Sequence, residues 1–239
     1  MALSYKTLNG GTQVTTLNSE RVMLTDANGN QLYINKADLA ASITPYVSAA
    51  KDDAWIVFLD SSNNRILVPW TEWDSSRTDA VGVAIMEGGR RLIIAPDESN
   101  LYWGSVSGVG GAITTTSKDV ADQDYAGKSN TAAIIASSSF TGDGAGYAPG
   151  YCNFYAKGAL GAGAWWMPSL GELGMIYSKY NAINAALAKI GGTSLTRSGY
   201  WSSTERSSAY AWGLSFGSGV RWYTSKATGQ FHVRPVTAF

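Results

Sequence analysis

The sequence has little with which to build a metal site, a disulfide bond or a charged interface. Cys152 is the only cysteine and His232 is the only histidine. One cysteine forms no intrachain disulfide, and this pair cannot supply the His- and Cys-rich ligand sets of zinc sites. Charged residues make up 15% of the chain, with 18 basic and 18 acidic side chains. Such a balance gives no attraction to nucleic acid or to an anionic membrane, so neither is expected as a partner.

Long apolar runs are also missing. No stretch approaches the roughly 18 consecutive apolar residues that suggest a membrane span, so no membrane insertion is expected. Met1 to Thr7 lack the basic and then apolar pattern of a secretory signal. A protein without such a signal that works outside cells would need another export route, such as release inside an assembled virion.

Glycine and large aromatic residues are abundant instead, with 27 Gly, 9 Trp and 13 Tyr. Many turns and rigid aromatics are typical of β-rich folds, in which most aromatics form the core. They are also typical of recognition surfaces, because Tyr and Trp give large contact areas at a low entropic cost. With 239 residues, 45% of them apolar, the chain can form one large domain and a small appendage.

Residues 1–50 differ from the rest of the chain. The run from Val22 to Ile34 predicts two short strands around an Asn28-Gly29 turn. A short helix is predicted from Asn35 to Ile43, ending near Pro45. This segment is too small to bury a core, so we expect an attachment or oligomerisation segment.

The remainder, residues 51–239, predicts a mixture of strands and helices. Hairpins are expected at 55–59 with 65–68 and at 81–86 with 91–95, followed by a long loop over 104–117. A short helix is predicted over 128–137. A longer one is predicted from Ser169 to Ile190, because Ser169 and Glu172 have capping-box spacing and Gly191-Gly192 follow the apolar stripe.

The last forty residues alternate in polarity and predict a three-stranded meander. Trp212, Leu214 and Phe216 would share one face of a strand, which leaves Ala211, Gly213 and Ser215 on an outer face of small residues. Turns are expected at 217–219 and 226–229, and residues 231–236 would close the meander.

Five short motifs follow one another in the second half of the chain. They are Trp166-Met-Pro-Ser-Leu-Gly-Glu-Leu173, Tyr200-Trp-Ser-Ser-Thr-Glu205, Ala211-Trp212, Phe216-x-x-Gly219 and Val233-Arg-Pro-Val-Thr-Ala-Phe239. In this order they resemble the C-type-lectin-fold variable proteins of diversity-generating retroelements, which include a phage tropism determinant. The resemblance covers roughly residues 51–239, and residues 1–50 are similar to attachment segments of phage structural proteins.

The resemblance implies an α+β, C-type lectin-like domain whose terminal strands and loops display a diversified binding surface. The variable region would span about 200–239, on a scaffold of Trp201, Trp212, Phe216, Arg234, Pro235 and Phe239. The alternation places Trp222 with the inward-facing residues, yet it lies in the variable stretch. It is therefore either a scaffold residue or a ligand contact. The ligand-binding residues implied are Arg206, Ser207, Ser208, Ala209, Tyr210, Gly213, Ser215, Gly217, Ser218, Arg221, Trp222, Tyr223, Thr224, Ser225, Ala227, Thr228, Gln230 and His232.

Catalytic and metal-binding alternatives have weaker support in the sequence. Cys152 is expected to be a small buried hydrophobic residue rather than a nucleophile. The acidic clusters at Asp97-Glu98 and from Asp119 to Asp124 are expected to be a turn and a solvated loop, so neither calcium nor another cofactor is expected. No carboxylate pair suggests glycan hydrolysis.

The resemblance implies host adsorption by a phage tail fibre, and no enzymatic activity is expected. The ligand would be a host cell-surface protein or glycan, and residues 1–50 would contact other phage tail proteins. By analogy with tail fibres, a homotrimer located in the virion and made in the host cytoplasm is expected. Two alternatives stay open: a bacterial surface adhesin of the same fold, and a glycan-depolymerising enzyme.

Overall fold

The computed structural model describes residues 13–17, 21–25, 31–35, 54–104, 114–137 and 146–239. The chain divides into two compact units, Met1–Lys51 and Asp52–Phe239.

The first unit contains a three-stranded antiparallel sheet in the order β1-β2-β3. The strands are β1 (Gln13–Leu17), β2 (Arg21–Thr25) and β3 (Gln31–Asn35). The predicted pairing of the two strands is confirmed, because Thr25 pairs with Gln31, and the predicted Asn28-Gly29 turn lies outside the described residues. Strand β1 was not predicted. Asn35 ends β3, and the rest of the helix predicted to start there lies outside the described residues.

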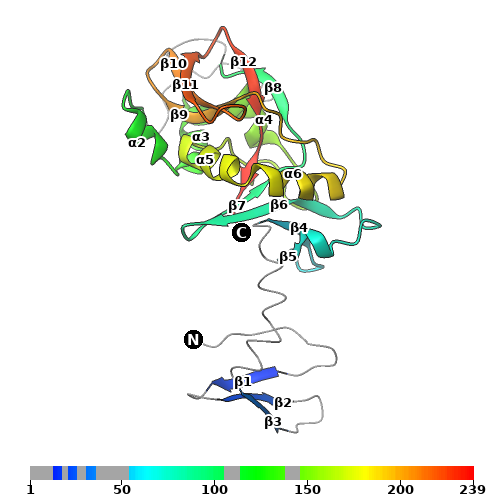
Figure 1. Cartoon of the computed structure of the whole chain (residues 1–239). Coiled ribbons are helices and arrows are strands. Elements are labelled where there is room, and N and C mark those ends of the chain that lie inside the picture. The colour runs from blue at the N-terminus through cyan, green and yellow to red at the C-terminus, as the bar shows by residue number, and fades with distance from the viewer. Residues whose placement is uncertain (1–12, 18–20, 26–30, 36–53, 105–113, 138–145) are drawn as a thin grey trace. The chain divides into compact units, whose positions relative to one another are not determined.

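The second unit begins with an antiparallel sheet, here the first sheet, in the order β13-β7-β6-β4-β5 (Figure 1). Both predicted hairpins are confirmed within it, and the turns explain why they form. Asn63 and the pair Gly88-Gly89 adopt the positive φ angles that tight turns require. The strands are β4 (Trp55–Leu59), β5 (Arg65–Pro69), β6 (Ala80–Glu87), β7 (Arg90–Ile94) and β13 (Val236–Thr237).

The second sheet has the order β11-β10-β9-β12-β8, and this order corrects the predicted meander. β10 and β11 form the expected hairpin. β12 does not continue from β11; it crosses to β9, with which it pairs in parallel, and pairs antiparallel with β8. The strands are β8 (Ser99–Tyr102), β9 (Gly199–Glu205), β10 (Tyr210–Ser215), β11 (Arg221–Ser225) and β12 (Gln230–Val233).

The long helix predicted from Ser169 to Ile190 is two helices that meet at Lys179. The backbone of Lys179 departs from α-helical angles, with φ −108° and ψ 16°. The predicted capping box is confirmed: Ser169 and Glu172 each bond the other's backbone N–H. The predicted helix over 128–137 is confirmed as α3, whereas α2 and α4 were not predicted. The helices are α2 (Lys118–Asp122), α3 (Gly127–Ala136), α4 (Ala148–Phe154), α5 (Leu170–Ser178) and α6 (Tyr180–Lys189), with a 3-10 turn at Trp70–Glu72.

Helices α5 and α6 lie between the two sheets (Figure 1). The largest apolar cluster joins all three layers, with Ile56 and Val83 from the first sheet, Leu173 and Ile183 from the helices, and Leu214 from the second sheet. A smaller cluster around Trp201 covers the opposite side of the second sheet. The second unit is therefore an α+β domain, as predicted, and both faces of its second sheet are packed.

Candidate functional site

The first two sequence motifs meet at a buried carboxylate, Asp124. This residue is 5% exposed, and its carboxylate accepts a hydrogen bond from Thr204 Oγ1 at 2.6 Å. Its backbone carbonyl accepts a hydrogen bond from Ser169 Oγ at 2.7 Å. The prediction of a solvated loop from Asp119 to Asp124 is therefore wrong, because α2 and this buried acid belong to the scaffold.

Glu98 holds the C-terminal motif in the same way. The Arg234 guanidinium is 1% exposed; its Nη2 lies 2.6 Å from Glu98 Oε2 and also donates to a backbone carbonyl. The Tyr200 hydroxyl donates to the same carboxylate oxygen at 2.8 Å. Glu98 was predicted to be part of a turn. It is instead a buried partner for two of the motifs.

His232, which was predicted as a ligand contact, also belongs to this internal group. Its Nδ1 lies 3.0 Å from Glu98 Oε1, and its side chain is 21% exposed. Its ring also packs against Tyr200, with centroids 5.3 Å apart. The side chain is therefore directed toward Glu98 and holds β12 against β9.

A buried ion pair supports the turn after β11. Lys226 and Glu205 have side chains 0% and 1% exposed, with Nζ 3.1 Å from Oε1. Lys226 also donates to the Ser208 carbonyl at 3.0 Å, and its ammonium lies 4.5 Å from the Trp103 ring centroid. The pair links the end of β9, the loop before β10 and the turn after β11.

The structure places the predicted ligand-binding residues at three levels of exposure, judged by whole residues. Those that are exposed are Ser208, Tyr210, Gly217, Ser218, Tyr223, Ala227, Thr228 and Gln230. Those that are half-buried are Arg206, Ser207, Ala209, Ser215, Arg221, Trp222, Thr224, Ser225 and His232. Gly213 alone is buried.

Gly213 and Trp222 require correction as contact residues. Ala211 and Gly213 face the Trp201 cluster rather than solvent, so the predicted outer face of small residues is wrong there. The Trp222 ring packs over Gly213 and lies 5.2 Å from the Trp201 ring and 4.4 Å from the Phe231 ring, between centroids. Trp222 is thus part of the scaffold, the first of the two alternatives open from the sequence.

Arg221 is not a free anchor either. Its Nε donates to Asp122 Oδ1 at 2.7 Å, and its Nη1 donates to the Gly219 carbonyl at 2.9 Å. Burial raises the pKa of Asp122, but hydrogen bonds from Lys118 and Arg221 outweigh it and leave that pKa below its ordinary value. Arg221 therefore fixes the 217–219 turn against α2.

Two exposed tyrosines and the half-buried Arg206 form a compact group, called here the Tyr210–Tyr223 cluster. Tyr210 is 41% and Tyr223 is 47% exposed. The two rings lie edge to face at 6.1 Å, and the Arg206 guanidinium stacks 3.8 Å from the Tyr223 centroid. Tyr223 also packs edge to face on the buried Trp212 ring at 5.5 Å. The cluster is therefore both exposed and held in place by the core.

The environment of Cys152 disfavours a nucleophilic role for its thiol. Cys152 is fully buried, as predicted, and burial raises the pKa of its thiol well above the ordinary value, which disfavours the reactive thiolate. In the part of the chain that the structure describes, no three His, Cys, Asp or Glu side chains gather as a metal site would require. Among the described helices, none has the length and apolar character to cross a membrane.

Comparisons with known proteins show a likeness of fold. No family model matches the chain, and no curated protein matches it. A crystal structure of a fimbrial protein from Bacteroides ovatus ATCC 8483 is similar, with a TM-score of 0.54 over 92% of this chain and 11% sequence identity. This chain spans 57% of the length of that protein. At this identity the likeness concerns the fold alone.

Proposed function

We propose that this chain is a non-enzymatic surface-recognition protein that binds a cell-surface protein or glycan through the Tyr210–Tyr223 cluster. The observation that carries the proposal is the cluster itself, in which two exposed tyrosines and one arginine are held by edge-to-face and cation–π contacts. Tyr and Arg are enriched among residues that dominate binding energy, and a preorganised group loses little entropy on binding.

The residues around the cluster suit this role. Ser207 and Ser208 lie in the loop before Tyr210, and Ser225 is paired with Tyr210 across the β10–β11 hairpin. Small hydroxyl groups around rigid aromatic anchors are the composition of adaptable binding surfaces. The likeness to a fimbrial protein is compatible with a surface role.

The more specific form of the proposal is a receptor-binding protein of a phage tail fibre. It rests on the five ordered motifs, which resemble retroelement-diversified variable proteins. In that form the virion would carry the protein as a homotrimer, attached through residues 1–50, and trimerisation would strengthen weak single-site binding. Its test is the DNA beside the gene, where a near-copy of the 3′ end and a reverse-transcriptase gene are expected.

The alternative form is an adhesin of a bacterial surface appendage, and the fimbrial likeness favours it. The two forms differ in where the protein is found. Copurification with virions supports the tail fibre, whereas copurification with the cell envelope supports the adhesin.

Adsorption of the fluorescently labelled protein to a panel of bacterial cells tests the shared claim. Replacing Tyr210 and Tyr223 together with serine should reduce adsorption by about tenfold or more, because aromatic anchors dominate such interfaces. Phe154→Ser is the matched control, since Phe154 is an exposed aromatic on α4, at 52%. Equal adsorption of the double variant and the control would contradict the proposal.

A further inference from the structure

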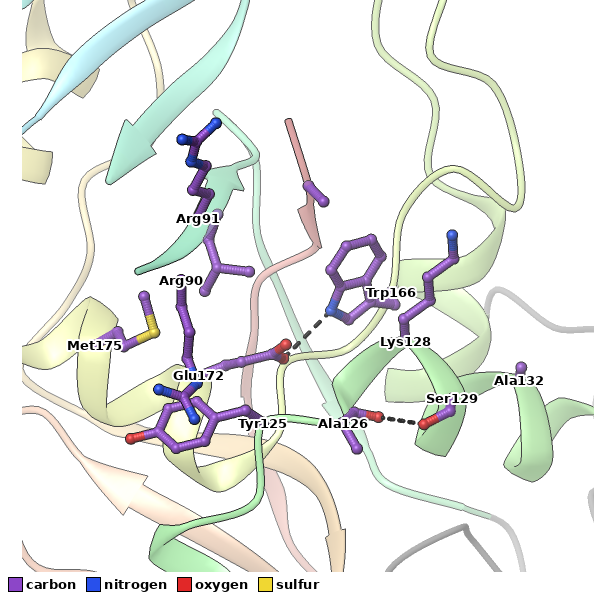
Figure 2. Close-up of a pocket in the computed structure, with 12 residues that line it drawn as sticks. Arg90, Arg91, Tyr125, Ala126, Lys128, Ser129, Ala132, Trp166, Glu172 and Met175 are labelled. Atoms are coloured by element: carbon purple, nitrogen blue, oxygen red, sulfur yellow. Dashed lines mark hydrogen bonds between the residues drawn. The ribbon is translucent and has the colours of Figure 1, made fainter. Parts of the chain in front are cut away.

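A second candidate site lies away from the residues of the Tyr210–Tyr223 cluster. A cavity of about 620 Å³ opens between β7, the connection from α2 to α3, and the start of α5 (Figure 2). Ligand-binding pockets commonly have volumes of roughly 300–1,000 Å³. The charged and aromatic side chains of the lining are Arg90, Arg91, Tyr125, Lys128, Trp166 and Glu172.

Three of these lining residues are exposed cations: Arg90, Arg91 and Lys128. Across the described ranges none of them forms an ion pair. The Arg90 guanidinium lies 3.7 Å from the Tyr125 ring centroid, and the Lys128 ammonium lies 5.8 Å from the Trp166 ring centroid. These contacts hold cationic groups beside aromatic rings while their charges stay available to a ligand.

Two aromatic rings give the cavity an apolar character. In Figure 2, Arg90 and Tyr125 lie on one side and Trp166 with Lys128 on the other, and the Glu172 carboxylate lies between them. The orientation of Trp166 is fixed, because its Nε1 donates to Glu172 Oε2 at 3.3 Å. A ligand entering here meets ring surfaces and aliphatic carbons as well as positive charge.

Glu172 is the one carboxylate of the lining, and its role in the fold accounts for it. It is 5% exposed, and Oε2 also accepts a hydrogen bond from the Ser169 backbone N–H at 2.9 Å. Burial raises the pKa of Glu172 to about 7, although the hydrogen bonds from Ser169 and Trp166 lower it. Against three cations this acid leaves the lining positively charged near neutral pH.

We infer that this cavity binds a carboxylate-bearing sugar, such as a uronic acid residue of a surface polysaccharide. The Arg90 guanidinium can pair with a carboxylate through two parallel hydrogen bonds, which a neutral sugar cannot accept in the same way, whereas the Arg91 guanidinium points away from that of Arg90 (Figure 2). The half-buried Tyr125 ring supplies apolar surface that matches the C–H face of a pyranose, and Trp166, which is 5% exposed, adds only a small part of its ring. The cavity shares no lining residue with the Tyr210–Tyr223 cluster, so this site does not depend on the proposed function.

The test uses defined small probes with the full chain. Saturation-transfer NMR and tryptophan fluorescence would compare methyl β-D-glucuronide with its neutral counterpart, methyl β-D-glucoside, and with acetate. The glucuronide should bind about tenfold or more tightly than either, because only it satisfies both the cations and the rings. Equal binding of the glucoside would overturn the charge requirement, and equal binding of acetate would overturn the sugar assignment.

Variants then locate the site. Arg90→Gln combined with Lys128→Gln should weaken glucuronide binding by about tenfold or more, since charge-assisted hydrogen bonds are lost. Arg65→Gln is the matched control, because Arg65 is an exposed arginine of the first sheet outside the lining. Circular dichroism would establish that each variant is folded. Unchanged binding in the double variant would overturn the inference. The Tyr210→Ser/Tyr223→Ser variant should bind the glucuronide as the unmodified chain does, so the two proposals fail separately.

Discussion

The Trp222 ring lies so close to Gly213 that a Cβ at position 213 would come within 2.4 Å of ring carbon Cζ2. The two residues are directly paired across the β10–β11 hairpin. A glycine is required here because the opposite ring occupies the space of any side chain. The last strands are therefore a packed scaffold on this side, and the proposed recognition surface lies around Tyr210 and Tyr223 instead.

Gly213→Ala should destabilise the domain. The added methyl group would displace the Trp222 ring from Trp201 and Phe231, and overpacking of this kind costs about 1–3 kcal/mol. Urea unfolding monitored by fluorescence measures the change. Gly161→Ala is the control, because a Cβ at position 161 meets no atom within 4 Å. Equal stability of the two variants would show that the ring yields without cost.

The buried Lys226–Glu205 pair predicts a non-additive result. Lys226→Met should destabilise the domain by roughly 3–5 kcal/mol, because it leaves the Glu205 carboxylate buried without its cationic partner. Adding Glu205→Gln should restore part of the loss, since the uncompensated charge is then gone. Unfolding free energies of both single variants and the double variant form the cycle. Simple additivity would contradict the coupling between the two side chains.

Glu172 predicts a pH dependence of stability. Its pKa is raised by burial to about 7 in the folded protein, from 4.5. The folded state therefore holds this proton more strongly, and the stability from Glu172 is complete below pH 4.5 and lost as pH rises through 7. The loss is on the order of 3 kcal/mol by pH 8, at about 1.4 kcal/mol per pKa unit.

Glu172→Gln separates this effect from other titrating groups. Glutamine keeps a hydrogen-bond acceptor for Ser169 and Trp166 but does not titrate. Unfolding free energies measured from pH 4.5 to 8 should show the unmodified chain losing stability relative to the variant. A constant difference across that range is the contrary outcome, and it would place the Glu172 pKa near its ordinary value.

Local sequence signals predicted the elements that depend on local chemistry. The hairpins β4–β5 and β6–β7 form around residues that tolerate positive φ, namely Asn63, Gly88 and Gly89. The start of α5 follows from the Ser169 and Glu172 side chains. Each of these signals is complete within a few residues, so no knowledge of the tertiary structure is needed.

The errors that affect the candidate site concern contacts between distant segments. Alternation in β12 is the same whether that strand pairs with β11 or with β9, so the strand order was not determined by the pattern. Alternation in β10 likewise predicts two faces of the strand. It does not show that α3 and α4 cover the face that carries Ala211. The burial of Glu98, Asp124 and Lys226 was not predicted, for a similar reason. Charged residues are usually exposed, and the buried partners of these three lie far along the sequence.

Site-specific photocrosslinking on cells that the protein adsorbs to would test recognition through the Tyr210–Tyr223 cluster. A photoreactive phenylalanine analogue at Tyr210 or Tyr223 should capture one cell-surface macromolecule, and the same analogue at Phe154 should not. Capture from position 154 alone, or no capture from 210 and 223 while the protein remains adsorbed, would contradict the account.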